Sequence, residues 1–366
     1  MTPFLTPQEA ARELKDGHCV ALPTETVYGL ACNALDPIAL QQLYAVKGRP
    51  SANPVICHVS SIKMAFAYGQ HNDLAQQLME HYWPGPLTIL LQRGSRIPDA
   101  VTAGSELCGF RLPDHEMTRE IIELCDFPLA IPSANKSGRT SPVTPAMVLS
   151  QLDGEIAGIV DGGQCSVGLE STVVAIEGNA LRILRPGLID AARLQADGFE
   201  VLTEGSAPSA APRKARTAKK VSGSVATALP EAKKELMSPG LLPVHYQPDV
   251  DLFLIEEYSA ENLNPGFPHA SYETVAVLNL GSEPIRLSHF LPIRLCENAL
   301  LRNRPTEEEA MHNLYLDLYE LARKSDVLVV VCPSYASPAL LDRLRRAATG
   351  IYADRKWSIR RENLTV

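Results

Sequence analysis

A basic pair, Lys47 and Arg49, is the strongest sign of chemistry in this sequence. A lysine point charge beside a guanidinium fork is a frequent phosphate-binding arrangement. The pair follows a helix-like run that Gly48 would end, so a basic helix end that complements the helix dipole explains it equally well. The spacing alone therefore leaves phosphate binding and helix termination as level alternatives.

Further polar clusters follow strand-like runs, where ligand-binding groups usually collect. The Thr-Glu-Thr turn at 24–26 is, on its own, typical of a capping device. Arg111 lies inside a strand-like run, which is costly unless a bound carboxylate or an acidic side chain pairs with it. Hydroxyl and amide residues at 133–141 could cradle an anion or simply form a turn. The same residue types return at Ser171 and Arg185.

Several catalytic and metal-binding motifs are absent from the sequence. There is no GxSxG nucleophile elbow, no HExxH zinc motif and no evident Ser/His/Asp set. The eight cysteines include no CxxC pair and mostly fall in apolar runs, which favours buried, reduced thiols over a metal site or disulfides. The pattern therefore indicates ligand binding and charge stabilisation rather than covalent catalysis.

The elements that must position these residues alternate between strand and helix. We expect strands at 19–23, 54–59, 86–91, 109–112, 129–131, 157–160 and 171–176. We expect helices at 38–47, 73–82, 115–125 and 144–152, capped by Asp36, by Asn72 or Asp73, by Asp114 and by Thr144. The irregular order predicts a mixed α/β domain rather than a regular βαβ array.

The remainder of the chain predicts a linker and a second domain. Residues 203–248 begin with a basic stretch rich in Ala, Pro, Ser and Lys, which reads as a solvated linker or, less simply, as a basic arm for RNA. After it come a strand at 274–280, a helix at 306–323, a buried strand at 327–331 and a helix at 338–348. We therefore predict domains at 1–202 and 249–366, the second a small Rossmann-like sheet.

The composition excludes several classes of protein. The 366 residues are 45% hydrophobic and 21% charged, as in a soluble globular chain, and the net charge of −8 argues against a surface that wraps nucleic acid. The first residues resemble no signal peptide, and no apolar run approaches the roughly 20 residues of a membrane span. We therefore expect a cytoplasmic protein with no membrane contact.

Taken together, the motifs resemble those of a known family. Lys47-x-Arg49 followed by Ser133-x-Asn135 is similar to the KxR…SxN signature of the threonylcarbamoyl-AMP synthase family, the YrdC-like proteins. PTETVYGL, KGRP…NP…H, PSAN and GLESTVV stand in that family's order over about residues 5–200. The segment SPGLLPVHYQP, residues 238–248, resembles the family's long, two-domain form. The family fold implied is a twisted mixed α/β sheet with a concave, positive cavity, followed by a second α/β domain.

The resemblance implies a nucleotidyl transfer. L-threonine, bicarbonate or CO2, and ATP would give threonylcarbamoyl-AMP and pyrophosphate, with Mg2+ arriving with ATP. A downstream threonylcarbamoyl transferase would use the product to modify tRNA to threonylcarbamoyladenosine, and direct contact with tRNA would be compatible with this role. The reaction needs two anions brought together and their charge neutralised, rather than a strong side-chain base.

The resemblance also implies site residues. Lys47 and Arg49 would take the catalytic role of neutralising phosphates, and Tyr246 would reach over the nucleotide as part of a lid. Other residues would line the nucleotide side: Asn53, Ser133, Asn135, Ser141 and Arg185. The threonine side would consist of Thr26, His58, Arg111 and Ser171, with Arg111 pairing the threonine carboxylate. No protein ligand to a metal is implied.

Two other functions compete with this interpretation. A non-catalytic protein that binds tRNA or double-stranded RNA would also use a cationic concave surface and a basic linker. The overall acidity and the lack of aromatics beside the basic run weigh against it. A related carbamoyl-adenylate module of hydrogenase maturation proteins is disfavoured, because the chain lacks zinc-finger cysteine pairs and an acylphosphatase segment.

Overall fold

The computed structural model describes residues 1–202, 245–256, 272–291, 293–333, 335–353 and 356–360, and every structural statement below concerns these residues. Most of the predicted linker, including the SPG part of the lid segment, lies outside the described residues. The predicted domain boundaries at 202/203 and 248/249 stay predictions.

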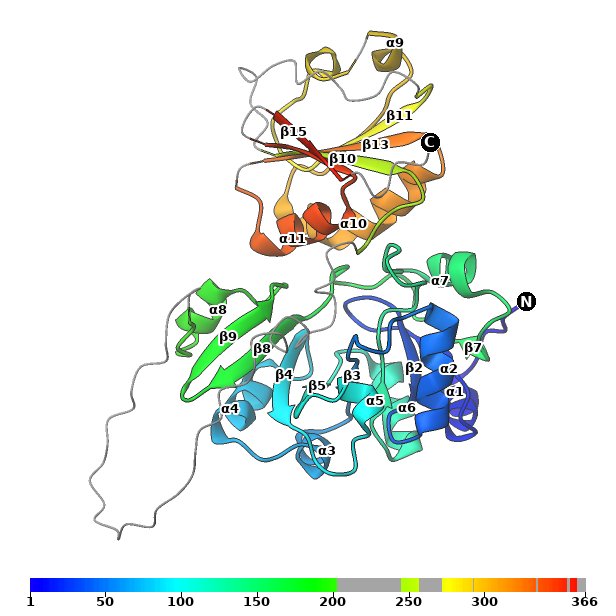
Figure 1. The fold of residues 1–366 in the computed structure, drawn as a ribbon, viewed down its shortest axis with the longest axis vertical. Coiled ribbons are helices and arrows are strands. Elements are labelled where there is room, and N and C mark those ends of the chain that lie inside the picture. Colours follow the sequence, from blue (N-terminus) through cyan, green and yellow to red (C-terminus); the bar gives the residue numbers. More distant parts are fainter. Residues whose placement is uncertain (203–244, 257–271, 292, 334, 354–355, 361–366) are drawn as a thin grey trace.

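The first domain is built on one mixed sheet, which has nine strands within the described ranges (Figure 1). From one edge to the other, the strands are β7 (Gly158–Ile159), β1 (Val20–Leu22), β2 (Gly29–Asn33), β6 (Leu129–Ala130), β3 (Ile56–His58), β5 (Leu107–Arg111), β4 (Leu87–Gln92), β8 (Thr172–Glu177) and β9 (Ala180–Arg185). Parallel and antiparallel pairs are mixed, which confirms the predicted fold class.

Most helices on this sheet begin after a residue whose side chain caps the first turn. The helices are α1 (Pro7–Lys15), α2 (Pro37–Lys47), α3 (Ile62–Tyr68), α4 (Asp73–Tyr82), α5 (Asp99–Thr102), α6 (Glu116–Cys125), α7 (Pro145–Leu152) and α8 (Ala191–Ala196). Asp36, Asn72 and Thr144 accept the expected hydrogen bonds from backbone N–H groups of the first turn. The prediction for Asp114 is wrong: His115 is the N-cap of α6 without a side-chain capping bond, and Asp114 instead pairs with Arg119 at 2.9 Å.

The second domain contains a six-stranded sheet in the described part of the chain, separate from the first sheet (Figure 1). Its strands, in spatial order, are β12 (Leu300–Asn303), β11 (Val275–Asn279), β13 (Val327–Cys332), β10 (Asp251–Glu256), β14 (Gly350–Ala353) and β15 (Lys356–Ile359). Its helices are the one-turn η2 (Leu287–His289), α9 (Ile293–Cys296), α10 (Glu307–Ala322) and α11 (Pro338–Ala347). All neighbouring strands except β14 and β15 are parallel, as expected for a Rossmann-like sheet.

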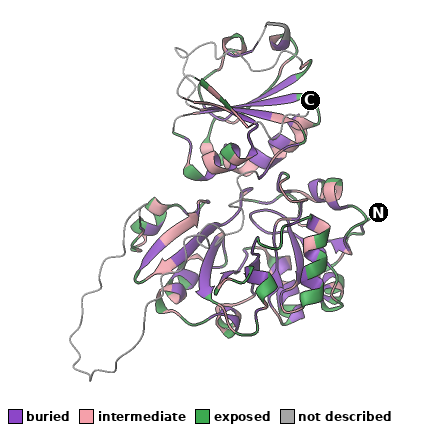
Figure 2. Cartoon of the chain, viewed as in Figure 1, coloured by how far each residue is buried: buried purple, intermediate pink, exposed green. Residues whose placement is uncertain are grey.

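Burial explains why the strands read as apolar runs. Both sheets are largely buried, whereas the outer faces of several helices are exposed (Figure 2). All six residues of β13 are buried, as the continuous apolar run predicts for a parallel strand covered on both faces. Seven of the eight cysteines are buried, as expected for cysteines in apolar runs. Within the described residues, no helix combines the length and apolar character needed to span a membrane.

The second domain packs on the first through α10 and α11. The φ angle of Gly168 is +82°, and a Cβ at this position would lie 2.2 Å from the carbonyl oxygen of His312 on α10. His312 shares a hydrogen bond between its Nδ1 and the carbonyl oxygen of Ser166 at 2.8 Å. Glycine at 168 is therefore required both by the left-handed backbone and by the close approach of α10.

Candidate active site

A polar pocket opens where β3 and β5 end and where β8 begins in the first domain. It encloses about 560 Å3 with its mouth included. Eight of the residues implied by the family resemblance line it: Thr26, Arg49, His58, Arg111, Ser133, Ser171, Arg185 and Tyr246. The parallel register of β3 and β5 places His58 directly opposite Arg111, which explains why two residues far apart in sequence share one wall.

Arg49 presents a fixed guanidinium to the pocket. Its Nε donates to the carbonyl oxygen of Asn53 at 3.2 Å, and its Nη2 donates to that of Pro54 at 2.7 Å. Burial is the main reason that the pKa of Arg49 falls to about 10, which leaves it cationic at neutral pH. Only 8% of the residue is exposed, so this charge lies in a setting where attraction to an anion is weakly screened.

Lys47 lies behind the pocket rather than on its wall. Its Nζ donates to the carbonyl oxygens of Ser133 and Asn135, at 2.5 and 2.6 Å. Burial, reinforced by the neighbouring Arg49 and Lys136, lowers the pKa of Lys47 well below its usual value. The structure thus joins both halves of the KxR…SxN signature, with Lys47 at the C-terminus of α2 holding the Ser-Ala-Asn turn in place.

Arg111 forms an ion pair with Glu25, the acidic residue of the Thr-Glu-Thr turn. Its Nη2 lies 2.7 Å from Oε1 of Glu25 and donates to Oγ1 of Thr26 at 2.8 Å. Both members of the ion pair are about 5% exposed. The turn is tightened by Thr24, whose hydroxyl donates to the carbonyl oxygen of Val27. The sequence left open whether Arg111 pairs with a bound carboxylate or with an acidic side chain. The structure shows a buried ion pair with an acidic side chain, that of Glu25.

His58 is a neutral group in this wall. Burial, with a further contribution from the adjacent Arg111, lowers its pKa well below the usual value. Its Nδ1 contacts the carbonyl oxygen of Ile56 at 3.4 Å. His58 can therefore offer a neutral donor or acceptor to a ligand but adds no positive charge.

Ser171 and Arg185 form the opposite side of the pocket. The guanidinium of Arg185 donates to the carbonyl oxygen of Ser171 at 2.9 Å and to its hydroxyl at 3.1 Å. The same hydroxyl shares a 2.8 Å hydrogen bond with Thr88. The adjacent pairing of β4 with β8 and of β8 with β9 brings these three residues together.

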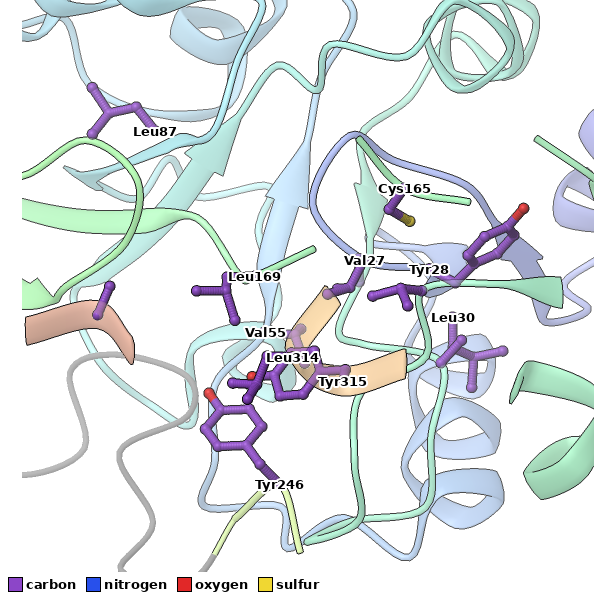
Figure 3. Close-up of a cluster of buried hydrophobic side chains, with 14 of the residues drawn as sticks. Val27, Tyr28, Leu30, Val55, Leu87, Cys165, Leu169, Tyr246, Leu314 and Tyr315 are labelled. Carbon is purple, nitrogen blue, oxygen red and sulfur yellow. The ribbon is translucent and has the colours of Figure 1, made fainter. Parts of the chain in front are cut away.

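His245 and Tyr246 cover the pocket from the segment before the second domain. Both are buried, and Tyr246 adopts a left-handed φ of +68°. The hydroxyl of Thr140 donates to the carbonyl oxygen of Tyr246 at 3.2 Å. The Tyr246 ring stacks on that of Tyr315 from α10, with centroids 5.5 Å apart (Figure 3). The second domain therefore supports the cover from behind.

Unpartnered polar atoms gather at this pocket. Among the buried side-chain atoms of the described residues that have no hydrogen-bond partner, three belong to residues that line the pocket: Nε of Arg111, Nδ1 of His245 and the hydroxyl of Tyr246. Nδ2 of Asn53, just outside the lining, is a fourth. Buried polar groups are normally paired, because an unpaired one costs free energy. Their concentration here indicates a site whose partners a polar ligand would supply.

The predicted residues thus fall into two groups. Eight line the pocket. Lys47 at the end of α2, and Asn53, Asn135 and Ser141 in neighbouring turns, lie outside the lining and hydrogen-bond to the segments around it. Their individual ligand roles stay predictions. Sequence reasoning did not select Glu25, Glu170 or His245, although each adjoins a residue that it did select. Tyr315 and Arg343 carried no local signal, since they lie more than 140 residues from their partner Glu170.

Family models match parts of both domains of the chain. A family model for the Sua5, YciO and YrdC proteins, described as "Telomere recombination", matches residues 12–187. A second model, described as "Threonylcarbamoyl-AMP synthase, C-terminal domain", matches residues 208–349. The chain is also similar to a crystal structure of Pyrococcus abyssi Sua5 complexed with L-threonine. The TM-score is 0.72 and the identity 28%, over 93% of this chain and 94% of that one.

Relatives found by sequence are named threonylcarbamoyl-AMP synthases. A threonylcarbamoyl-AMP synthase of Bacillus subtilis is 42% identical over 51% of this chain and 55% of its own length. A putative threonylcarbamoyl-AMP synthase of Methanocaldococcus jannaschii is 33% identical over 50% of this chain and 86% of its own length. The chain thus spans about half the length of the first of these relatives and most of the second.

Proposed function

We propose, since this chain belongs to the threonylcarbamoyl-AMP synthase family, that it is an L-threonylcarbamoyladenylate synthase and so a nucleotidyltransferase. It would condense L-threonine, bicarbonate or CO2, and ATP. The observation that carries this proposal is the convergence of Arg49, Arg111 and Arg185 on one enclosed pocket. Buried cations that meet around a cavity suit two small anionic substrates better than they suit an extended RNA backbone.

In the proposed reaction, the threonine amine attacks CO2, a nitrogen–carbon bond forms, and the amine loses a proton to give a carbamate. A carbamate oxygen then attacks the α-phosphorus of ATP. The new phosphorus–oxygen bond forms as the bond to the bridging oxygen breaks, and pyrophosphate leaves with the electron pair. The enzyme must hold two anions in line and neutralise the growing charge on the phosphates.

The threonine half of the pocket would lie around Arg111. We propose that this guanidinium binds the substrate carboxylate, while Glu25 fixes its orientation. Neutral groups would contact the remaining polar atoms of threonine: Thr26, His58 and Ser171. A neutral His58 suits this role, because a second cation beside Arg111 would be costly in so buried a wall.

The nucleotide half would lie between Arg49 and Arg185. We propose that these two arginines contact phosphate oxygens and that Lys47 acts from behind by shaping the turn at Ser133. The other residues proposed for this half are Asn53, Asn135, Ser141 and Tyr246. The aromatic ring of Tyr246, backed by Tyr315, would close over the nucleotide and keep water from the carbamate.

Mg2+ is proposed to arrive with ATP and not to occupy a dedicated protein site. Groups of three or more metal-ligating side chains are not found among the described residues. Glu170 in the pocket wall and Glu25 behind it do not fit a ligand set either, because Glu25 pairs with Arg111 and Glu170 pairs with Arg343. The triphosphate would therefore hold the ion, which would add charge neutralisation.

Pyrophosphate release tests the proposal. The full chain is incubated with ATP, L-threonine, bicarbonate and Mg2+, and each is omitted in turn. We expect pyrophosphate release that requires both threonine and bicarbonate. The proposed product would then serve a separate threonylcarbamoyl transferase that modifies tRNA. Salt-dependent RNA binding without threonine-dependent release would contradict the proposal and favour an RNA-binding protein.

A further inference from the structure

A carboxylate stands in the wall of this cationic pocket. Glu170 immediately precedes Ser171, lines the pocket and is only 8% exposed. An ionised carboxylate at this position would repel a nucleotide triphosphate, because charges in a buried site are weakly screened. A site that binds anions must therefore neutralise Glu170 or keep it engaged elsewhere.

Most of the groups that engage Glu170 come from the second domain. Its Oε1 accepts a hydrogen bond from the hydroxyl of Ser141 at 2.7 Å, within the first domain. Its Oε2 accepts from the hydroxyl of Tyr315 on α10 at 2.8 Å and from Nε of Arg343 on α11 at 3.2 Å. The only cation that forms an ion pair with Glu170 in the described residues is thus Arg343.

Arg343 also fixes the backbone on both sides of the pocket wall. Its side chain is fully buried, with no exposed surface. Beyond the carboxylate, its guanidinium donates to the carbonyl oxygen of Glu170 at 3.3 Å and to that of Pro186 at 2.5 Å. Pro186 directly follows Arg185, so one side chain of α11 contacts the segments that carry Ser171 and Arg185.

The same cluster supports the aromatic cover. The guanidinium carbon of Arg343 lies 5.8 Å from the ring centroid of Tyr246. Tyr315 stacks on the same ring (Figure 3). Glu170, Arg343, Tyr315 and Tyr246 therefore form one connected group, which we call the interdomain cluster. It joins the second domain to the nucleotide side of the pocket.

We propose that Arg343 is a positioning residue for nucleotide binding: it neutralises Glu170 from the second domain and so makes the pocket wall compatible with a triphosphate. The proposal rests on the proposed function, which supplies the triphosphate. It assigns the second domain a role in the electrostatics of the active site, in addition to its contact with the cover.

The charge state of Glu170 agrees with this role. Burial would raise the pKa of Glu170, but Arg343, followed by Arg185, holds that pKa below its usual value. Glu170 is therefore ionised at neutral pH, and its charge needs compensation. Loss of the Arg343 cation would leave Glu170 compensated by Arg185 alone, the cation that we propose for the phosphates.

The test compares three variants of the full-length chain. Arg343→Met removes the cation and keeps most of the side-chain volume. Arg343→Met combined with Glu170→Gln removes both charges. Arg345→Met is the matched control, because Arg345 lies on the same helix but is half exposed and pairs with Glu256 away from the pocket. ATP affinity is measured by calorimetric titration, and threonine-dependent pyrophosphate release is measured in parallel.

We expect Arg343→Met to weaken ATP binding by roughly 100-fold, as for a broken buried ion pair. The double variant should recover at least about tenfold of that loss, because it removes the unpaired charge. The control should bind ATP like the parent. Unchanged ATP affinity in Arg343→Met, or a double variant that binds no more tightly than Arg343→Met, would overturn the proposal, since a purely structural role predicts no recovery by charge removal.

A milder variant covers the case in which Arg343→Met does not fold. Tyr315→Phe removes the hydroxyl that donates to Glu170 and keeps the ring that stacks on Tyr246. We expect a several-fold higher KM for ATP with little change in kcat, and an unchanged KM would count against the proposal. Failure of the parent chain to release pyrophosphate would instead contradict the proposed function, so the two failures are distinguishable.

Discussion

The Arg111 guanidinium lies 2.7 Å from the Glu25 carboxylate, although 86 residues separate them and both are buried. This pair fixes the cation that we propose for the threonine carboxylate. Because each charge compensates the other in a poorly solvated wall, neither can be removed alone without leaving an unpaired buried charge.

Removal of Glu25 should therefore destabilise the first domain. We expect Glu25→Ala to lower the free energy of unfolding by about 3–5 kcal/mol, measured from urea denaturation curves. The matched control is Asp114→Ala, which breaks the exposed pair with Arg119 and should cost no more than about 1 kcal/mol. Equal and small effects in the two variants would contradict the structural role of the Glu25–Arg111 pair.

Arg49 should not tolerate replacement by lysine. Its guanidinium bridges the carbonyl oxygens of Asn53 and Pro54 and faces the pocket at the same time, which a single ammonium group cannot reproduce. We expect both Arg49→Lys and Arg49→Ala to reduce threonine-dependent pyrophosphate release by roughly 100-fold or more. Lys63→Ala, an exposed control, should leave the rate unchanged. Parent-like activity in Arg49→Lys would exclude the fork-shaped contact.

Protonation of His245 should make the fold sensitive to acid. Burial lowers the pKa of His245 to about 3, whereas the usual value is 6.5. The unfolded chain therefore binds a proton that the folded chain does not, in the window from about pH 6.5 down to about pH 3. Stability from this group is fully present above pH 6.5 and is lost as the pH falls through the window.

The measurement is the free energy of unfolding in urea at pH 7.0, 6.0 and 5.0. In the parent chain, His245 should contribute a loss of up to about 1.4 kcal/mol per pH unit below pH 6.5. His245→Gln should show a shallower decline than the parent. Parallel pH curves for the two proteins would show that His245 is not held neutral by the fold.

Gly168 offers a direct test of domain docking. Alanine at 168 combines a left-handed backbone with a Cβ that would lie 2.2 Å from the His312 carbonyl oxygen of α10. Gly163→Ala is the matched control, because its φ is also positive (+73°) but its Cβ would meet open space. We expect the Gly168 variant to lose at least about 1 kcal/mol more unfolding free energy than the control, from overpacking. Equal losses would contradict this contact.

The residues that could be predicted from sequence are those whose environment is set locally. Helix starts at Asp36 and Thr144 follow from short-range capping, and the buried strand at 327–331 follows from its unbroken apolar run. The strand β2 was not expected, because it begins at Gly29 inside a motif that reads as a turn. Asp114 is not a cap because α6 starts one residue later than expected, with His115 as its N-cap, and Asp114 pairs with the half-buried Arg119.

Contacts across the fold lay beyond what the sequence could show. The partners of Arg111 and Glu170 depend on which strands and helices meet, and Arg343 reaches Glu170 across 173 residues. The placement of Lys47 against the Ser133 and Asn135 carbonyls likewise needs the turn to fold back on α2. The order of the motifs predicts that these residues belong to one site. Only the structure distinguishes the residues that line the pocket from those that support its walls.

The most direct test of the central claim follows the bicarbonate carbon. The full-length chain is incubated with ATP, L-threonine, Mg2+ and 13C-bicarbonate, and the adenylates are analysed by mass spectrometry. We expect a threonine-linked AMP derivative whose mass increases by one unit with the label and which is absent without threonine. Pyrophosphate release with no labelled adenylate, or no release at all, would contradict the assignment of this pocket to threonylcarbamoyl-AMP synthesis.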